Sequence, residues 1–195
     1  MTIPRFPTVV VSRDWSYIPD RAFTENRFAG NLNVQRAEHV EREMRKWRLP
    51  LLAATQAERA AIEAFFAANG VATKFLLKDL ADKARTAITL EPVTSGGSVT
   101  RWKIPDAGLQ GGDFPDDAAG TYVVRVGGSP VTVSSVDTDL REFILQTGVA
   151  DTSDVDADYE YFLLSLFSAL PQWTHRSALE VWSTVLEIEE TGRDA

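Results

Sequence analysis

The chain has 195 residues, of which 44% are apolar and 25% are charged, so it is long enough for one ordinary domain or two small ones. Its 20 Lys and Arg against 28 Asp and Glu give a net charge of -8, which argues against general binding to polyanions or anionic membranes. The chain has no cysteine, which excludes a disulfide scaffold, a thiolate zinc site, an iron–sulfur cluster and a cysteine nucleophile.

No membrane or export segment is predicted. The first residues lack the basic and apolar regions of a secretion signal. The longest apolar run, residues 162–170, is about half of the ~20 residues that a helix needs to cross a bilayer. We therefore expect a soluble protein.

Charge is distributed unevenly along the chain. Residues 1–60 carry ten Arg and Lys against seven Asp and Glu, a balance of +3, whereas residues 106–160 carry two against twelve, a balance of -10. Such a split indicates either two differently solvated surfaces or a polarity that orients the protein against a neighbouring molecule.

The first predicted elements are a strand at 40–52 and a helix at 56–69. Charged residues occupy both odd and even positions around Trp47, so the strand lacks the alternation of polar and apolar residues that is typical of a sheet with one buried face. The helix begins with a capping box, Thr55 with Glu58, and ends at Gly70. Its apolar side chains fall at helical spacing and form one stripe: Ile62, Phe65 and Phe66.

Most of the remaining chain is predicted to form strands. A strand at 75–78 follows the helix, and residues 85–155 consist of short apolar runs broken by Gly-Gly pairs and prolines, which is typical of a small antiparallel sandwich. Its clearest hairpin joins 123–126 to 131–133. Two long strands at 159–170 and 179–188 end the chain; the first is apolar on both faces, so we expect a helix on one face and a second sheet or neighbouring subunit on the other.

No catalytic, cofactor-binding or metal-ligating residue is predicted. The nucleophile-elbow, phosphate-loop, dinucleotide-binding and zinc-protease motifs are absent from the sequence. Asp154, Asp156 and Asp158 have the spacing that opens a calcium loop, but Tyr159 stands where that loop needs glycine, so an acidic linker is favoured. The basic residues around Trp47 could contact nucleic acid, but neighbouring glutamates neutralise much of their charge.

Three blocks of sequence resemble the distal tail proteins of long-tailed phages and gene transfer agents. The first runs from Glu-Asn-Arg-Phe at 25–28 through the strand ending at Leu51, the helix with Phe65-Phe66, and Phe75 to Asp79 with Asp82. The second comprises 100–104 and 122–128, and the third the terminal strands with Tyr159-Glu-Tyr161, 179–182 and 186–188. The likeness lies in order and spacing and covers most of the chain.

The resemblance implies a mainly β (α+β) fold: a tail-tube-like β-sandwich flanked by one helix at about 56–69, with a small inserted antiparallel β domain. The ring-forming domain would comprise 1–85 and 156–195, and the insert 86–155. It further implies a hexameric ring at the virion tail tip that joins the tail tube protein to the hub or baseplate protein and the receptor-binding apparatus. DNA would pass through its lumen without specific binding, and the protein would be made in the cytoplasm of a bacterial host.

A ring needs two different faces on each subunit, and a basic amino-terminal portion meeting an acidic middle or carboxy-terminal portion is one way to set its polarity. The predicted subunit interface comprises seven residues: Arg42, Arg45, Trp47, Arg48, Trp173, His175 and Arg176. Two other classes of function stay open. A sandwich with exposed Trp102 and Tyr122 could be a carbohydrate-binding module, and scattered carboxylates could form a hydrolase site.

Overall fold

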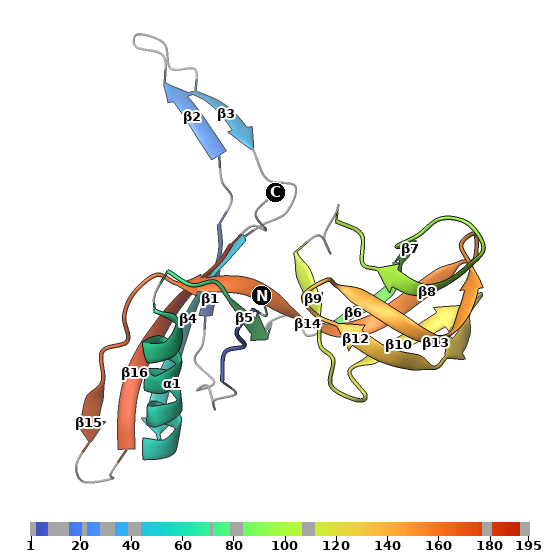
Figure 1. The fold of residues 1–195 in the computed structure, drawn as a ribbon. Helices are drawn as coiled ribbons and strands as arrows, with labels where there is room; N and C mark the ends of the chain where they lie inside the picture. Colours follow the sequence, from blue (N-terminus) through green and yellow to red (C-terminus); the bar gives the residue numbers. More distant parts are fainter. Residues whose placement is uncertain are drawn as a thin grey trace. The chain divides into compact units, whose positions relative to one another are not determined.

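The computed structural model describes residues 3–7, 16–20, 23–27, 34–38, 44–70, 72–78, 84–106, 112–176 and 181–191 (Figure 1). Within these ranges the fold is mainly β with a single helix, as predicted. The chain divides into two compact units: unit 1 comprises Met1–Arg5 and Leu76–Leu164, and unit 2 comprises Phe6–Phe75 and Ser165–Ala195. The division thus falls at 75/76 and 164/165, where the sequence placed it at 85/86 and 155/156.

Unit 1 contains two antiparallel sheets. One has the order β6 (Ala84–Thr89), β14 (Val155–Phe167), β10 (Tyr122–Val126) and β11 (Ser129–Val131); the other has the order β7 (Glu91–Pro92), β8 (Ser98–Lys103), β13 (Glu142–Ala150) and β12 (Val133–Asp137). Leu90 alone separates β6 from β7, and Thr132 alone separates β11 from β12. The outermost strands of one sheet therefore run on into the outermost strands of the other, as at the corners of a barrel. Each of these four outermost strands pairs with one strand of its own sheet.

The β10–β11 hairpin confirms the hairpin predicted at 123–133, with a tighter turn. Val126 lies opposite Ser129, so only Gly127 and Gly128 form the connection. Both have positive φ, 55° and 81°. Two consecutive positive φ values are what the favoured two-residue hairpin turn requires, and glycine adopts them without steric cost.

The interior of unit 1 is aromatic. Phe143 lies with its ring centroid 5.8 Å from that of Tyr159. Trp102 is 1% exposed and its Nε1 donates to the carbonyl oxygen of Val99 at 3.3 Å. The expectation that Trp102 is exposed is therefore wrong: it lies opposite Phe143 of β13, and both side chains are buried in the core. Tyr122 is half-buried.

Two short elements complete unit 1 beside β14. β5 (Phe75–Lys78) confirms the strand predicted at 75–78; its first residue, Phe75, is the last residue of the first segment of unit 2. β9 (Asp113–Pro115) pairs with β14 at residues 161–163. β14 begins at Val155, four residues before the predicted start, so the acidic linker expected around Asp156 and Asp158 is wrong. Both carboxylates bind Arg125 on the neighbouring strand, which lets this acidic segment join the sheet.

Unit 2 is built on β4 (Met44–Ala54) and β16 (Val181–Glu190), which pair along most of their lengths. β1 (Ser16–Asp20) pairs with the far side of β4. β15 (Thr174–Arg176) and the end of β14 pair with the far side of β16. These strands confirm the strand predicted at 40–52 and the last strand predicted at 179–188, with shifted ends. β15 lies between the two strands predicted at 159–170 and 179–188, where no strand was predicted.

Helix α1 (Gln56–Asn69) has the predicted bounds. Thr55 and Glu58 form the capping box: Thr55 Oγ1 accepts from the Glu58 backbone N–H at 3.2 Å, and Glu58 Oε2 accepts from the Thr55 N–H at 2.8 Å. The N–H of Gly70, with φ 69°, donates to the Phe66 carbonyl at the other end. The helix packs against β4 and β16 and contributes Ile62 and Phe65 to the core (Figure 1).

An aromatic cluster fixes α1 in unit 2. Phe65 lies 5.5 Å from Phe75 and 5.5 Å from Phe6 between ring centroids, both in edge-to-face geometry. Phe167, at the end of β14, stacks 4.6 Å from Phe75 and 4.1 Å from Phe66. Such pairs add about 0.5–1.5 kcal/mol each beyond their buried area.

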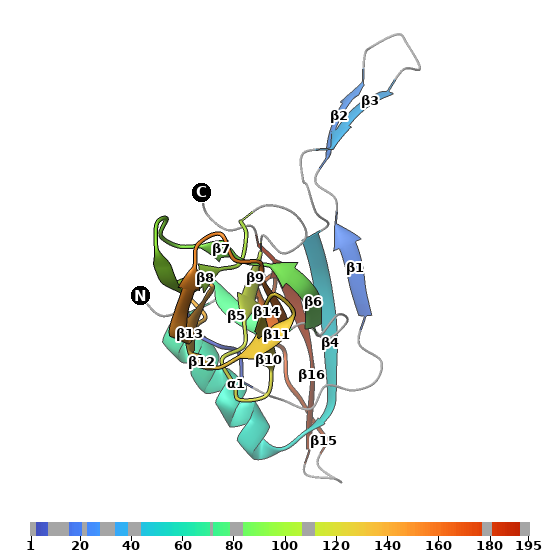
Figure 2. The same cartoon turned by 90° about the vertical axis from the view of Figure 1, so that its right-hand side faces the viewer.

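A separate hairpin, β2 (Phe23–Arg27) with β3 (Val34–Glu38), lies between β1 and β4 in the sequence (Figure 2). Its strands pair only with each other among the described strands. An isolated two-stranded hairpin is at best marginally stable in water. Within the described parts of the chain, no helix is long and apolar enough to span a bilayer.

Candidate subunit interface

One face of the unit 2 sheet points away from the core. Along β4, Leu49 and Leu51 are buried while Arg48 and Leu52 are exposed. Along β16, Leu186 and Ile188 are buried while Val185 and Glu187 are exposed. We call the outward set the β4–β16 outer face; it comprises Lys46, Arg48, Pro50, Leu52, Val185, Glu187 and Glu189.

The two ends of the outer face differ in character. At one end Arg48 lies directly opposite Glu187, and Lys46 lies opposite Glu189. Directly opposed side chains in an antiparallel pair have Cβ atoms about 4.5–5.5 Å apart, so these opposite charges favour the pairing. At the other end Val185 lies opposite Pro50, beside Leu52, whose exposed fraction is 46%. The basic character predicted for this strand is thus largely balanced within its own sheet.

Both sides of the unit 2 sheet end in strands with a single described partner. β1 pairs with β4 alone, and β15 pairs with β16 alone. The outer backbone groups of such strands can accept a further strand. The two edges lie on opposite sides of one sheet and differ in sequence, so each can pair with the other in a second copy.

The short strand β15 brings together aromatic and cationic side chains. His175 lies opposite Trp182 on β16, with ring centroids 4.4 Å apart and planes inclined by 32°. The guanidinium of Arg59, from α1, lies 3.6 Å from the centroid of the Trp182 ring and also binds Glu63 at 2.8 Å. A cation at this distance is attracted to the indole face. His175 remains exposed at the surface.

Six of the seven predicted interface residues fall within described strands or the loop before β15. Trp47 is 2% exposed and belongs to the core of unit 2, whereas Arg48 lies on the outer face. Arg45 lies in β4 opposite Pro19, and Arg176 in β15 opposite Val181. Arg42 lies outside the described residues.

Trp173 and His175 sit at the same end of unit 2. The Nε1 of Trp173 is buried and has no hydrogen-bond acceptor among the described residues. Sequence reasoning missed Trp182 as the neighbour of His175, and Arg59 as a second neighbour of Trp182. The sequence indicated only that Arg59 lies on the polar face of the predicted helix and that Trp182 lies in the last predicted strand.

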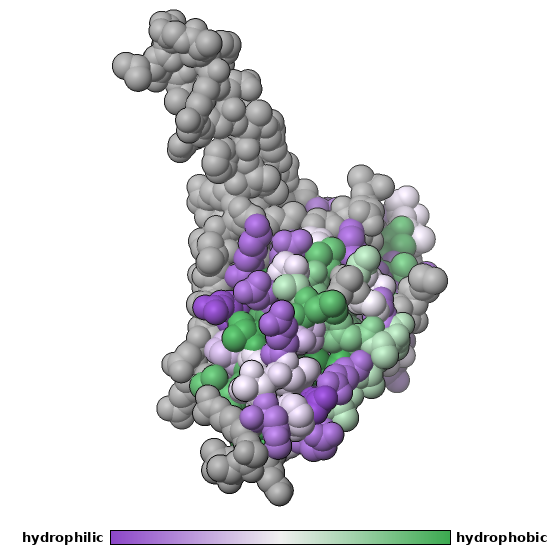
Figure 3. All heavy atoms as spheres, turned by 90° about the vertical axis from the view of Figure 1, so that its left-hand side faces the viewer, coloured by the Kyte–Doolittle hydropathy of each residue, from purple (hydrophilic) through white to green (hydrophobic). Residues whose placement is uncertain are grey.

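On the side of the molecule that carries β15 in Figure 1, apolar residues lie among hydrophilic ones (Figure 3).

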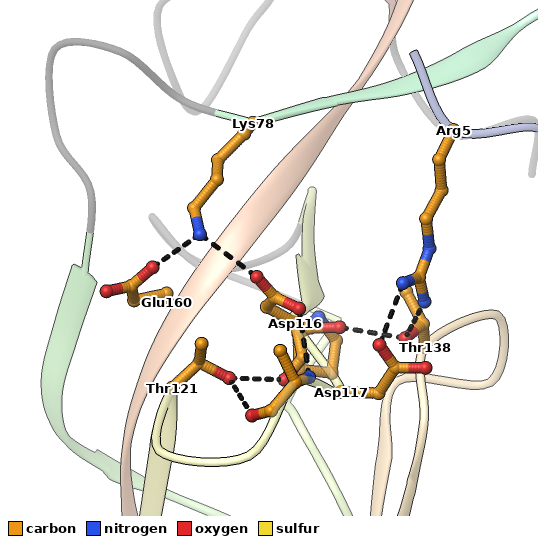
Figure 4. A network of polar contacts seen from close by, with 9 residues as sticks. Arg5, Lys78, Asp116, Asp117, Thr121, Thr138 and Glu160 are labelled. Carbon is orange, nitrogen blue, oxygen red and sulfur yellow. Dashed lines mark hydrogen bonds and ion pairs between the residues drawn. The ribbon is translucent and has the colours of Figure 1, made fainter. Parts of the chain in front are cut away.

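Ion pairs tie the amino-terminal segment and β5 to unit 1 (Figure 4). Arg5 binds Asp117 at 2.7 Å and Thr138 at 3.0 Å, and Lys78 binds Asp116 at 3.0 Å and Glu160 at 2.6 Å. Burial alone would lower the pKa of Lys78, but hydrogen bonds to these two carboxylates raise it above its usual range. Lys78 therefore stays protonated, which suits a structural tie and not a nucleophile or base.

A second polar cluster in unit 1 is centred on two buried residues, Asp113 and Arg141. Asp113 and Arg141 have no exposed surface, and Arg141 donates to the Asp113 carbonyl at 2.6 Å and to Asp106 at 2.8 Å. The Asp113 carboxylate binds Arg85 at 2.8 Å and accepts from the Tyr159 hydroxyl at 3.4 Å. Burial, with the adjacent charge of Asp113, raises the pKa of Tyr159 well above its usual value, so the hydroxyl remains a donor.

The described residues of unit 2 offer contact surfaces at its sheet edges, on the β4–β16 outer face and around β15. In the parts of the chain that the structure describes, no group of three or more His, Asp or Glu side chains is placed to hold a metal ion. Neither a protein-family model nor a curated protein sequence matches the chain.

Proposed function

We propose that this protein is a structural virion component, a ring-forming distal tail protein that joins a phage tail tube to the hub or baseplate and the receptor-binding apparatus. The observation that carries the proposal is that the unit 2 sheet ends in two different strands, β1 on one side and β15 on the other, each with a single partner among the described strands.

Two different complementary edges make a head-to-tail contact, and such contacts close into a ring when the rotation between copies is an integral fraction of a turn. The exposed apolar end of the β4–β16 outer face adds surface that a copy can bury. The resemblance of the three sequence blocks to distal tail proteins implies six copies at the tail tip. DNA would pass through the lumen without base-specific contacts, with the tail tube protein and hub protein as neighbours.

Two leucines allow a matched test of the face that assembles. Leu52, on the outer face of unit 2, is 46% exposed, and Leu140, in unit 1, is 47% exposed. A lysine at either site should change the free energy of unfolding by no more than about 0.5 kcal/mol. We expect Leu52→Lys to shift the sedimentation profile from rings toward protomers, while Leu140→Lys sediments like the unmodified protein. Equal profiles for the two variants would contradict the assignment of the interface.

The carbohydrate-binding alternative loses one of its two predicted aromatic residues, because Trp102 is buried. Tyr122 remains partly accessible.

A further inference from the structure

A small pocket opens on unit 1 over β14, where this strand lies between β6 and β10. Its volume is about 160 Å³. The residues that matter for its chemistry are Arg85, Thr121, Tyr122, Val123, Asp158 and Glu160. Since each water occupies about 30 Å³ in the liquid, the pocket holds roughly five waters, the size of one sugar ring rather than of a longer chain.

Each charged group of the pocket already has a counterion inside unit 1. Arg85 binds Asp113 at 2.8 Å, Asp158 binds Arg125 at 2.5 Å, and Glu160 binds Lys78 at 2.6 Å. The carboxylate of Asp158 also accepts the backbone N–H of Ala87 at 2.8 Å. The polar groups are therefore fixed in position, and none presents an uncompensated charge to a ligand. This balance favours a neutral ligand with hydroxyl groups over an anion or a cation.

The pocket also offers carbon surface. Tyr122 is half-buried and is supported from within by Phe143, at 6.0 Å between ring centroids. Val123, the next residue, is 43% exposed. An apolar wall with a few fixed polar groups is the usual composition of a small-molecule site. A sugar ring matches it, because its C–H groups can contact the aromatic side chain while its hydroxyls pair with carboxylates.

We propose that this pocket binds one ring of a neutral saccharide. The site lies within unit 1 and is independent of the ring-forming role proposed for unit 2. It would give the assembled protein a low-affinity contact with glycans, repeated once per copy, so that a ring would gain avidity from many weak sites.

The test uses the intact chain and an array of neutral oligosaccharides containing glucose, galactose, rhamnose and N-acetylglucosamine. We expect binding to at least one of them, with affinity weakened at least about tenfold by Tyr122→Ala and by Val123→Glu. Leu140→Glu is the control, since Leu140 is equally exposed in the same unit and lies outside the pocket.

Thermal melting and native mass are measured on all variants, so that loss of folding or of assembly is distinguished from loss of the pocket. The proposal is overturned if no saccharide binds, or if the folded Tyr122→Ala and Val123→Glu variants bind as well as the control. Ring formation is scored separately, so either proposal can fail alone.

Discussion

Replacing Asp113 by asparagine should open unit 1, because this carboxylate is the centre of its buried polar cluster. Asp113 has no exposed surface and binds Arg85, whose side chain is only 16% exposed. Asp113→Asn keeps the shape of the side chain and removes its charge. Arg85 would then lose the counterion that it binds at 2.8 Å.

Breaking a buried ion pair by removing one partner costs about 3–5 kcal/mol. Because Arg85 reaches solvent to a small extent, we expect the lower end, about 3 kcal/mol. The matched control is Asp117→Asn, which removes the same charge from a pair whose side chains are 41% and 44% exposed. Exposed pairs contribute about 0–1 kcal/mol.

Amide hydrogen exchange in β8 and β13 is the suitable assay, since it reports the opening of unit 1 separately from that of unit 2. A loss of about 3 kcal/mol corresponds to exchange that is on the order of 100-fold faster. Asp117→Asn should accelerate exchange by less than about tenfold. If the two variants exchange at similar rates, the buried cluster is not what holds unit 1 closed, and the reasoning is refuted.

Three further predictions concern single groups. The hydrogen bond from Arg125 holds the pKa of Asp158 below its ordinary value of 3.8. This pair therefore stabilises the fold above pH 3.8, and the stabilisation is lost as the pH falls below that value. The difference in melting temperature between the unmodified protein and Arg125→Gln should shrink from about pH 6 to about pH 3. Phe167→Ala should cost about 3–5 kcal/mol in urea unfolding, with Leu170→Ala, at a 67% exposed site, as the near-neutral control. Thr55→Ala should cost about 1 kcal/mol and speed exchange in the first turn of α1, whereas Thr55→Ser should not.

The sequence predicted best what local chemistry determines. The capping box at Thr55 and the glycine at 70 fix both ends of α1, because each satisfies backbone groups within a few residues. Gly127 and Gly128 likewise fix the hairpin turn, where positive φ values are required.

What the sequence did not show depends on pairing between distant residues. The start of β14 at Val155 rests on Arg125, which neutralises Asp156 and Asp158 from another strand. The passage of the chain between the two sheets of unit 1 takes place at Leu90 and at Thr132, single residues between consecutive strands. Neither leaves a periodic signal in the chain.

The candidate interface was predicted in part. His175 was singled out as an interface residue, but its stacking on Trp182 and the contact of Arg59 with the same ring join three distant segments. Trp47 was grouped with the arginines around it, whereas strand alternation turns it into the core and leaves Arg48 outside. Its neighbours in sequence gave no indication of which face α1 covers.

The native mass of the purified protein, measured together with electron micrographs of the same sample, tests the central claim most directly. The account predicts a ring with a central pore and a mass of about 130 kDa, six times 21.6 kDa. A mass of 21.6 kDa that persists at the highest concentration at which the protein stays in solution, with no rings in the micrographs, would contradict it.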